Sequence, residues 1–236
     1  VAQLGKPAEI HIDRSARLLP LSTDPQVAEY YRSLRTKLVQ ARELKLFRTL
    51  AVTSPNPKEG KTVTVLNLAL SFAMLPSFKV LVIDGDLRKG SLGKWLGADR
   101  YAGLGNYLEG TATMEQIVLK NDKFPVHFVV RGNSETSPGE LLHGQRWKKF
   151  LHRMAEHYDL ILVDCPPVNI VTDTQLLAAG CEGVLLVARA FTTTCKAFQK
   201  AVADMSSFRI VGTVLNQATG MLMQRGYGVY GRYAKS

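Results

Sequence analysis

The chain has 236 residues, 46% of them hydrophobic, which is enough to bury a substantial core, most simply as one α/β domain. Its apolar runs are much shorter than the roughly 20 residues that cross a bilayer, so we expect a soluble chain. No secretory leader opens it, and its cysteines lack metal-type spacing, which predicts reduced thiols in a cytosolic protein.

The formal net charge of +10 is large. A nucleic acid, an anionic membrane leaflet or bound phosphates would each explain it. The basic residues are dispersed, however, and no interleaving of aromatic and basic residues marks a nucleic-acid platform. We therefore expect no nucleic-acid partner, and solvated helix faces explain the charge equally well.

Short apolar runs alternate with longer helical patterns along the chain. The runs predict strands at 49–54, 79–84, 126–130, 160–164, 183–188 and 210–215. The patterns between them predict helices over roughly 25–44, 61–75, 145–157, 174–180 and 194–206. This order is typical of an α/β fold with a mainly parallel twisted sheet and helices on both faces. Ligands of such sheets bind at the carboxyl ends of the strands.

The first predicted helix begins at Pro25, because Asp24 suits the N-cap and proline suits the first helical position. One apolar stripe then faces the core, formed by Val27, Tyr31, Leu34, Leu38 and Ala41. Glu29, Arg32 and Arg35 occupy a neighbouring flank. From the residues alone, this flank is a solvated face whose ion pair is worth only a few tenths of a kcal/mol.

The stretch SPNPKEGKT follows a predicted strand and precedes a predicted helix, which is the context that a phosphate-binding loop requires. The usual first glycine of G-x-x-x-x-G-K-[ST] would fall at position 55, which is proline. Lys61 would reach the β- and γ-phosphates of ATP, and Thr62 would offer its hydroxyl to Mg²⁺. The residues expected to contact the nucleotide here are Pro57, Lys58, Glu59, Gly60, Lys61, Thr62 and Val63.

Two further strand ends carry carboxylates. The stretch VLVIDGDLRKG places Asp84 and Asp86 just past a strand, with Arg88 two residues on. Residues two apart on an extended chain point the same way, so both carboxylates are expected to face one site. The stretch YDLILVDCPP ends its strand at Asp164. Because Mg²⁺ prefers one or two carboxylates plus phosphate oxygens, Thr62, Asp86 and Asp164 are predicted to hold it, directly or through water.

The tail RGYGVYGRYAKS carries Tyr227, Tyr230 and Tyr233 between glycines. It is poor in aliphatic residues, so we do not expect it to pack into a core. From the residues alone it is either a cloning remnant or a segment that binds partners nonspecifically. We divide the chain into an N-terminal extended segment, one domain and this tail, with the boundaries 1–23, 24–222 and 223–236.

These motifs resemble those of the bacterial tyrosine kinases (BY-kinases), cytoplasmic P-loop enzymes tied to capsule and exopolysaccharide export. SPNPKEGKT, VLVIDGDLR and LILVDCPP look like the Walker A, A′ and Walker B motifs of that family. EYYRSLRTKL resembles its E-x-x-R-x-x-R oligomerisation helix, and SPGELL resembles its Pro-x-Glu-Leu-Leu segment. The similarity runs from about Asp24 to the C-terminus. The A′ and E-x-x-R-x-x-R motifs discriminate most, because Walker A and B alone also suit partitioning and septum-placement ATPases.

The resemblance implies a P-loop NTPase-like fold and an autokinase that phosphorylates tyrosines from ATP and Mg²⁺. It makes the three tail tyrosines phosphosites, and it assigns Glu29, Arg32 and Arg35 to the contacts of a ring of subunits. In such a ring, the tail of one subunit would reach the site of its neighbour. Phosphorylation would add about −1.5 to −2 charges per tyrosine, which is expected to weaken tail docking and loosen the ring.

The same resemblance suggests a catalytic set of Lys61, Asp84, Asp86 and Arg88. Asp84 would orient the incoming hydroxyl and accept its proton, although Asp86 could take this role instead because two such close carboxylates titrate together. Arg88 would steady the transferring charge or, as the safer choice, the carboxylates of the site. Asn216 matches an asparagine that related ATPases use on adenine, and a strand-end turn residue is an equally good explanation.

Two positions keep alternative explanations. The family usually has glycine where this chain has Lys58. If the backbone needs a positive φ there, lysine costs stability; otherwise its ammonium adds attraction for phosphate. Asp173 either supports the site from behind or is an ordinary helix N-cap.

Two other functions compete with the kinase. A partitioning-type ATPase would carry lysine at position 56, where this chain has Asn56. A catalytically weakened regulatory subunit would bind ATP and Mg²⁺ without incorporating phosphate. The family also implies a membrane partner, either a separate transmembrane adaptor or a polysaccharide co-polymerase segment that the chain lacks. Such a partner would hold the protein at the inner face of the cell membrane. A start at Val1 rather than methionine fits a piece of a longer protein.

Overall fold

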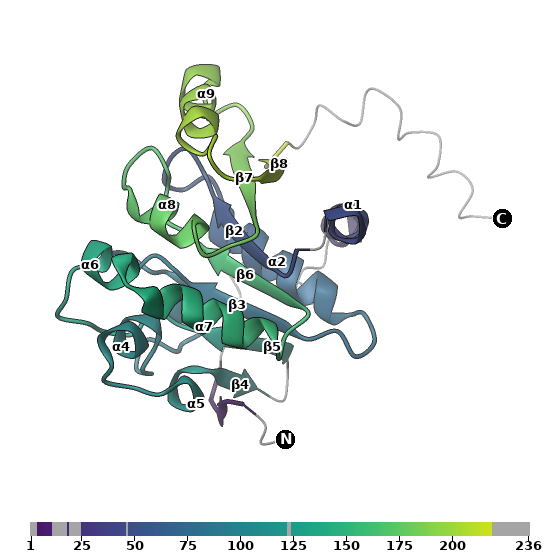
Figure 1. Ribbon diagram of the computed structural model, residues 1–236. Helices are drawn as coiled ribbons and strands as arrows, with labels where there is room; N and C mark the ends of the chain where they lie inside the picture. The colour runs from purple at the N-terminus through teal and green to yellow at the C-terminus, as the bar shows by residue number, and fades with distance from the viewer. Residues whose placement is uncertain (1–3, 11–17, 19–24, 46, 122–123, 219–236) are drawn as a thin grey trace.

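The structure is a computed structural model that describes residues 4–10, 18, 25–45, 47–121 and 124–218. Within these ranges, one eight-stranded sheet runs in the order β1–β4–β5–β3–β6–β2–β7–β8 (Figure 1). Its strands are β1 (Lys6–Pro7), β2 (Thr49–Thr53), β3 (Val80–Asp84), β4 (Leu119–Asn121), β5 (Phe124–Val129), β6 (Leu160–Asp164), β7 (Gly183–Arg189) and β8 (Ile210–Asn216). Neighbouring strands are parallel, except that β4 is antiparallel to β5.

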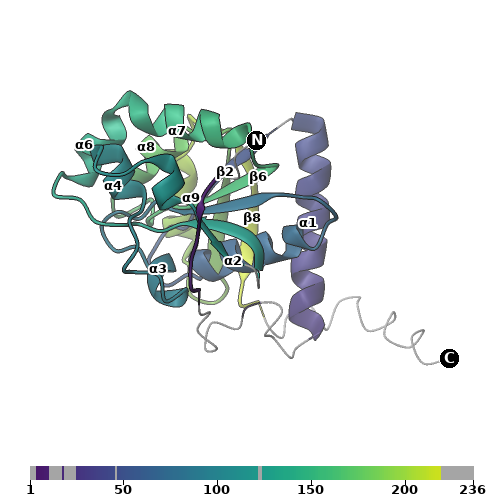
Figure 2. The same cartoon turned by 90° about the horizontal axis from the view of Figure 1, so that it is seen from below.

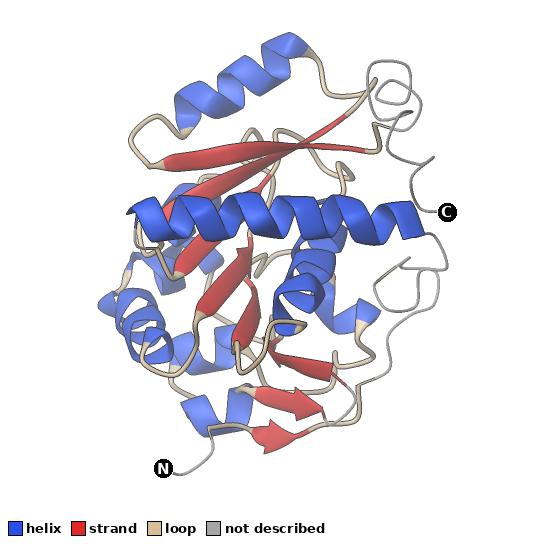
Figure 3. Ribbon diagram, turned by 90° about the vertical axis from the view of Figure 1, so that its right-hand side faces the viewer, coloured by secondary structure: helices blue, strands red, loops and turns tan. Residues whose placement is uncertain are grey.

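Helices cover both faces of the sheet. One face carries α1 (Pro25–Lys45), α2 (Lys61–Ala73) and α3 (Leu92–Trp95). The other carries α4 (Leu104–Glu109), α5 (Met114–Ile117), α6 (Pro138–His143), α7 (Gln145–Ala155), α8 (Asp173–Ala178) and α9 (Cys195–Asp204). Figure 2 separates the two helical layers, and Figure 3 shows α1 lying across the sheet.

Strand alternation divides the core into two parts. In β2, Leu50 and Val52 pack with α1 and α2, whereas Ala51 faces the opposite layer. Successive side chains of a strand point to opposite faces, so each central strand supplies both cores. All residues of β2, β3 and β6 are buried, which explains why their apolar runs do not alternate with polar residues.

The predicted α/β fold with a mainly parallel sheet is confirmed. Each predicted strand and helix is present, with ends that differ from the prediction by about two residues, as assignment methods themselves do. The sequence patterns do not predict β1, β4 or the short helices α3 to α6. Elements of so few residues are too short to show a hydrophobic period. None of the helices in the described ranges is both long and apolar enough to pass through a bilayer.

The central strands place the motifs at one edge of the sheet. β3, β6 and β2 are consecutive neighbours, so the loops at their carboxyl ends lie side by side. In register, Asp164 of β6 is paired with Asp84 of β3 on one side and with Val52 of β2 on the other. The Walker A-like, A′-like and Walker B-like stretches therefore meet at this edge.

Candidate active site

The loop after β2 leads into α2 through a left-handed glycine. Gly60 is the N-cap of α2 and has φ 91°. Asn216, at the end of β8, donates from Nδ2 to the carbonyl of Glu59 at 3.0 Å. A Cβ on Gly60 would lie 1.9 Å from that same Nδ2, so only glycine fits here. The first backbone amides of α2 have no partner within the helix and are available to an anion.

Lys58 decides one of the open alternatives. Its φ is 62°, so the backbone does require the left-handed region at this position. A lysine there costs about 1–2 kcal/mol compared with glycine. Arg189, at the end of β7, donates from Nη1 to the Lys58 carbonyl at 3.5 Å. The Lys58 side chain itself is exposed.

Glu59 turns its side chain into the protein and is 1% exposed. Its carboxylate accepts hydrogen bonds from Asn56 N at 2.9 Å and Asn56 Nδ2 at 3.1 Å. It also accepts from the hydroxyl of Thr193 at 2.6 Å, which ties the loop to the segment between β7 and α9. Glu59 therefore shapes the loop, and only its backbone remains to face a ligand.

Thr62, in the first turn of α2, contacts the carboxylate at the end of β6. Its hydroxyl donates to Asp164 Oδ2 at 2.6 Å. The other oxygen, Oδ1, is buried and has no hydrogen-bond partner among the described residues. Because buried polar atoms are nearly always paired, this oxygen fits a missing ligand. A Mg²⁺ ion bound by Asp164 and Thr62 would supply that partner.

The described residues contain no group of three or more His, Cys, Asp or Glu side chains arranged for a metal ion. At phosphate sites, Mg²⁺ is held by one or two carboxylates and by oxygens of the substrate rather than by a complete protein cage. The buried Oδ1 of Asp164 and the hydroxyl of Thr62 fit a metal bound in this way.

Burial raises the pKa of both carboxylates at the strand ends. Burial raises the pKa of Asp164 to about 6, while the positive charge of Lys61 and the bond from Thr62 lower it. The pKa of Asp84 is raised well above its ordinary value, first by burial and then by the charges of Asp164 and Asp86. A bound divalent cation would favour the charged forms of these groups.

The loop after β3 is shaped by its own carboxylates. Asp84 accepts hydrogen bonds from the amide of Leu92 at 3.1 Å and from the amide of Asp86 at 3.2 Å. Asp86 in turn accepts from the amide of Lys89 at 2.8 Å. Asp84 is buried, whereas Asp86 is only partly buried. The two carboxylates that sequence spacing places together thus have different surroundings.

Arg88 binds Asp173 rather than the carboxylates of the motifs. Its Nε and Nη2 donate to the two carboxylate oxygens of Asp173, at 2.6 and 3.1 Å. Asp173 lies in the first turn of α8, and the N-cap position belongs to Thr172. The N-cap explanation of Asp173 is therefore wrong, and its side chain anchors the A′ loop to α8. The direct contact of Arg88 is thus with Asp173, and its expected role in steadying the site's carboxylates stays a prediction.

Three residues of the site were not singled out from the sequence. The hydroxyl of Ser91 lies 3.2 Å from that of Thr62, and Thr193 and Arg189 hold the loop after β2. Arg189 and Thr193 follow the predicted strand 183–188, so the rule that ligands bind at strand ends would have pointed to them. Ser91 lies just beyond the A′-like stretch and has no comparable signal.

The residues expected at a ring contact separate into two environments. Glu29 and Arg32 pair with each other on the surface of α1, with exposed side chains. Arg35 instead donates from Nη1 to the carbonyl of Ser71 at the end of α2. It therefore joins two helices of this chain. The tyrosines expected as phosphosites, Tyr227, Tyr230 and Tyr233, lie outside the described residues.

This fold and edge define a P-loop nucleotide-binding protein of the α/β class. A family model described as an AAA domain matches residues 48–200. The chain is 35% identical to the putative tyrosine-protein kinase EpsB of Ralstonia nicotianae over 92% of its own length, and it spans 29% of that protein. It is 32% identical to the tyrosine-protein kinase CpsD of Streptococcus agalactiae, over 88% of this chain and 90% of that one.

A solved structure supports the same assignment. The kinase domain of the Escherichia coli tyrosine kinase ETK is 31% identical, with a TM-score of 0.77 over 80% of this chain and 74% of that one. The chain therefore belongs to the bacterial tyrosine kinase family associated with capsule and exopolysaccharide, and the resemblance of its motifs is confirmed.

Proposed function

We propose that this chain transfers the γ-phosphoryl group of ATP to tyrosine hydroxyls, including Tyr227, Tyr230 and Tyr233 of its own tail. The observation that carries the proposal is the buried Oδ1 of Asp164, which lacks a hydrogen-bond partner within the described part of the chain and lies beside the hydroxyl of Thr62. Membership of the tyrosine kinase family supports tyrosine as the acceptor. Asn56, in place of lysine, argues against a partitioning-type ATPase.

Each residue of the site has a separate role in this reaction. Lys61 and the first amides of α2 hold the β- and γ-phosphates. Thr62 and Asp164, with Asp86 directly or through water, would hold Mg²⁺, which would neutralise charge on the phosphates when bound. The tyrosine oxygen forms a bond to the γ-phosphorus while the bond from that phosphorus to the leaving ADP breaks. Asp84 takes the hydroxyl proton, a role that suits a buried carboxylate with a raised pKa.

Asn216 and the loop backbone form the nucleotide end of the site. The Asn216 amide lies against Gly60 and bonds to the carbonyl of Glu59, so the asparagine is placed beside the phosphate loop. We assign the hydrogen-bonding capacity that the Asn216 side chain still has to the base of ATP. Arg88 holds the A′ loop in position through Asp173, and with it Asp84 and Asp86.

We extend the proposal to the assembly. The exposed pair Glu29–Arg32 on α1 is available to a neighbouring subunit, whereas Arg35 acts through its bond to α2. In a ring, the tail of one subunit would enter the site of the next. A transmembrane adaptor or co-polymerase segment would hold the ring at the inner face of the cell membrane, where phosphorylation regulates polysaccharide chain length and export.

Incubation with labelled ATP and Mg²⁺, followed by mapping of phosphorylated residues, tests the proposal. Wild type is expected to carry label on the tail tyrosines. Lys61→Met should remove the label, and a triple variant with phenylalanine at positions 227, 230 and 233 should remove the mapped sites while still binding ATP. Label that is absent from wild type, or unaffected by Lys61→Met, contradicts the proposal.

Two additional readouts separate the alternatives. A protein that binds a fluorescent ATP analogue but incorporates no phosphate would be a regulatory subunit, an outcome with which the strained Lys58 agrees. Sizing of the phosphorylated and unphosphorylated forms tests the ring. The phosphorylated form is expected to elute as a smaller species, and identical elution contradicts control of assembly by the tail.

A further inference from the structure

Every charged side chain on the outer side of helix α7 is basic. The inner side of the helix, formed by Trp147, Phe150, Leu151 and Met154, is buried in the core. We call the exposed side the basic face of α7, and its residues are Arg146, Lys148, Lys149, His152 and Arg153. They span about 160° of the helix at 100° per residue. Figure 1 and Figure 2 show α7 on the outside of its layer, so this face is turned to solvent.

This charge pattern is unfavourable for an isolated helix. Arg146 and Lys148 lie in the first turn, where the helix dipole favours acidic side chains and disfavours basic ones. The first turn of α7 has no acidic residue. Lys149 and Arg153 are four residues apart, and like charges at this spacing repel each other on a helix surface. A local rule that is broken without an internal compensation is expected at a functional surface.

The described residues provide little counter-charge for this face. Among them, no ion pair involves a residue of α7. Arg146 donates to the carbonyl of Leu108 at 3.1 Å, which leaves its charge unneutralised. Two acidic residues border the C-terminal end of the face. Glu156 is the C-cap of α7, and Glu115 on α5 has a pKa that is lowered first by its own backbone amide and, to a smaller extent, by the charge of Arg153. The four arginine and lysine charges of the face outnumber these two.

Other helices of this chain balance such charges. Helices α5, α6 and α8 each have an acidic residue in the first turn. On α1 and α9, basic residues pair with Glu29 and Asp204. Helix α2 begins with Lys61 and also lacks an acidic residue in its first turn, and there the proposed phosphates of ATP supply the counter-charge. By the same reasoning, the counter-charge of the basic face of α7 comes from a partner outside the described residues.

The geometry of the basic face suits a flat surface that carries negative charge. The helix has 11 residues and is about 16 Å long. None of the large apolar side chains that are exposed in the described ranges lies on α7, so the face has nothing to insert into the hydrocarbon of a bilayer. It also presents no exposed aromatic ring on which the bases of a single strand could stack. Charge at the level of lipid headgroups is therefore the attraction that remains.

We propose that the basic face of α7 binds directly to an anionic lipid surface, by contacts with the phosphate and carboxylate groups of the lipids. The inference goes beyond the proposed function, because this contact requires neither ATP nor the membrane partner. Each arginine or lysine close to such a surface strengthens binding about fivefold, so four of them give a weak attachment that adds to any other tether. Helix α1 lies on the opposite face of the sheet, so the pair Glu29–Arg32 stays accessible.

Sedimentation of the full chain with lipid vesicles tests this inference. The protein is expected to bind vesicles that contain about 30% phosphatidylserine at least tenfold more tightly than vesicles of phosphatidylcholine alone, and to lose most of this preference at about 0.5 M salt. The double variant Lys148→Glu/Lys149→Glu should bind the anionic vesicles at least about 30-fold more weakly. The matched control is Lys37→Glu/Lys94→Glu, which changes the net charge equally at exposed positions of α1 and α3, on the opposite face. It should stay within about threefold of wild type.

Three outcomes would overturn the inference: equal binding to both kinds of vesicle, equal weakening by the two double variants, or binding through Lys148 and Lys149 to duplex DNA in preference to anionic vesicles. Thermal unfolding checks that the α7 variant is folded, and its Tm should not fall because acidic residues suit the start of a helix. If it does fall, Lys148→Gln/Lys149→Gln takes its place in the same comparison. Lys61→Met should bind vesicles as wild type does, so a wild type that binds them without incorporating phosphate would contradict the proposed function alone.

Discussion

The loops after β2 and β3 lie side by side at one edge of the sheet, but different contacts hold them. The loop after β2 is held by distant residues, through Glu59 to Thr193, the Glu59 carbonyl to Asn216 and the Lys58 carbonyl to Arg189. The loop after β3 also has a distant contact, the pair of Arg88 with Asp173, but its turn is formed by carboxylates within the loop. These accept from amides a few residues away.

Because of this difference, we expect the two loops to serve different purposes, protein stability in the first and phosphoryl transfer in the second. In the first loop, Lys58 and Gly60 adopt left-handed backbone conformations, and contacts with distant residues maintain them. In the second loop, Asp84 shapes the turn and, in the proposed function, also accepts the proton of the tyrosine. Substitutions in the first loop should therefore change folding and nucleotide affinity, whereas those in the second should change phosphoryl transfer.

Among the variants that test this comparison, Asp84→Asn is expected to have the largest effect. Asparagine keeps an oxygen that can accept from the Leu92 amide, but it cannot take a proton from the acceptor. Phosphate incorporation should fall about 100-fold or more, with ATP affinity within a few-fold of wild type. Single-turnover labelling beside titration with a fluorescent nucleotide measures both quantities. Transfer at the wild-type rate would remove Asp84 from the catalytic set.

Glu59→Ala tests the first loop. It removes the acceptor of Asn56 and Thr193, leaves partly buried donors unpaired and should lower the free energy of unfolding by about 1–3 kcal/mol. Nucleotide affinity should fall as well, because the loop loses its shape. Thr193→Val deletes only the cross-link and is expected to cost about 1 kcal/mol. Denaturant unfolding gives both values, and equal stability of Glu59→Ala and wild type would contradict this account.

Asp164 lies between the two loops, and its titration is expected to make the stability of the protein depend on pH. Its pKa of about 6 in the folded protein lies above the ordinary value, so its contribution to stability is present at low pH and is lost as pH rises through 6. Without Mg²⁺, Asp164→Asn should therefore be more stable than wild type at pH 7.5, by on the order of 2–3 kcal/mol. The advantage should shrink toward pH 4. Thermal unfolding across this range, with EDTA present, measures it; parallel profiles would mean that the pKa is not raised.

Lys58→Gly should give the smallest effect. Glycine removes the cost of a positive φ, about 1–2 kcal/mol, but adds about 0.5–1 kcal/mol of unfolded-chain entropy. The net gain should be below about 1 kcal/mol, which corresponds to a rise in Tm of about 1–3 °C. Lys58→Ala removes the charge but keeps the strain, so it serves as the control and should give no rise.

The two loops also show how much the sequence could predict. The order of strands and helices follows from apolar periods of adequate length, and the rule for strand ends brings Thr62, Asp84 and Asp164 to one edge. The sign of φ at Lys58 does not follow from local sequence, because it depends on contacts from β7 and β8. The bond between Arg88 and Asp173 joins residues 85 positions apart, and no spacing in the sequence indicates it.

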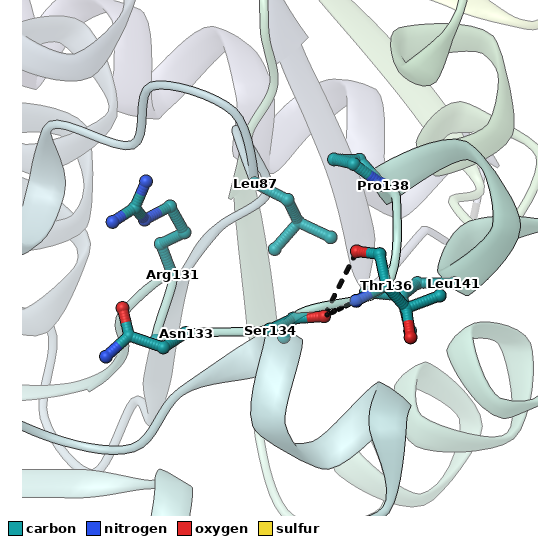
Figure 4. Close-up of a pocket in the computed structure, with 9 residues that line it drawn as sticks. Leu87, Arg131, Asn133, Ser134, Thr136, Pro138 and Leu141 are labelled. Carbon is teal, nitrogen blue, oxygen red and sulfur yellow. Dashed lines mark hydrogen bonds between the residues drawn. The ribbon is translucent and has the colours of Figure 1, made fainter.

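A pocket lined in part by Leu87 lies beside the loop after β3 (Figure 4), and the sequence does not indicate it. Its walls come from the segment 131–136 and from α4 and α6, which are too short to show a period. Its shape depends on Glu109, whose carboxylate organises a loop more than 20 residues away. Only the SPGELL stretch, which forms the start of α6, marks this region in the sequence.

The short strand β1 has a consequence for how the protein should be produced. The amides of Lys6 and Ala8 donate to the carbonyls of Val118 and Lys120, so β1 covers the edge of β4 that faces away from β5. Ile10 and Leu18, from the same stretch, are buried in the core. A version trimmed to begin at α1 would expose the edge of β4 and apolar surface of the core. Exposed, unpaired sheet edges of this kind pair with the edges of other chains. Preparations lacking the first two dozen residues should therefore self-associate or precipitate where the longer ones do not.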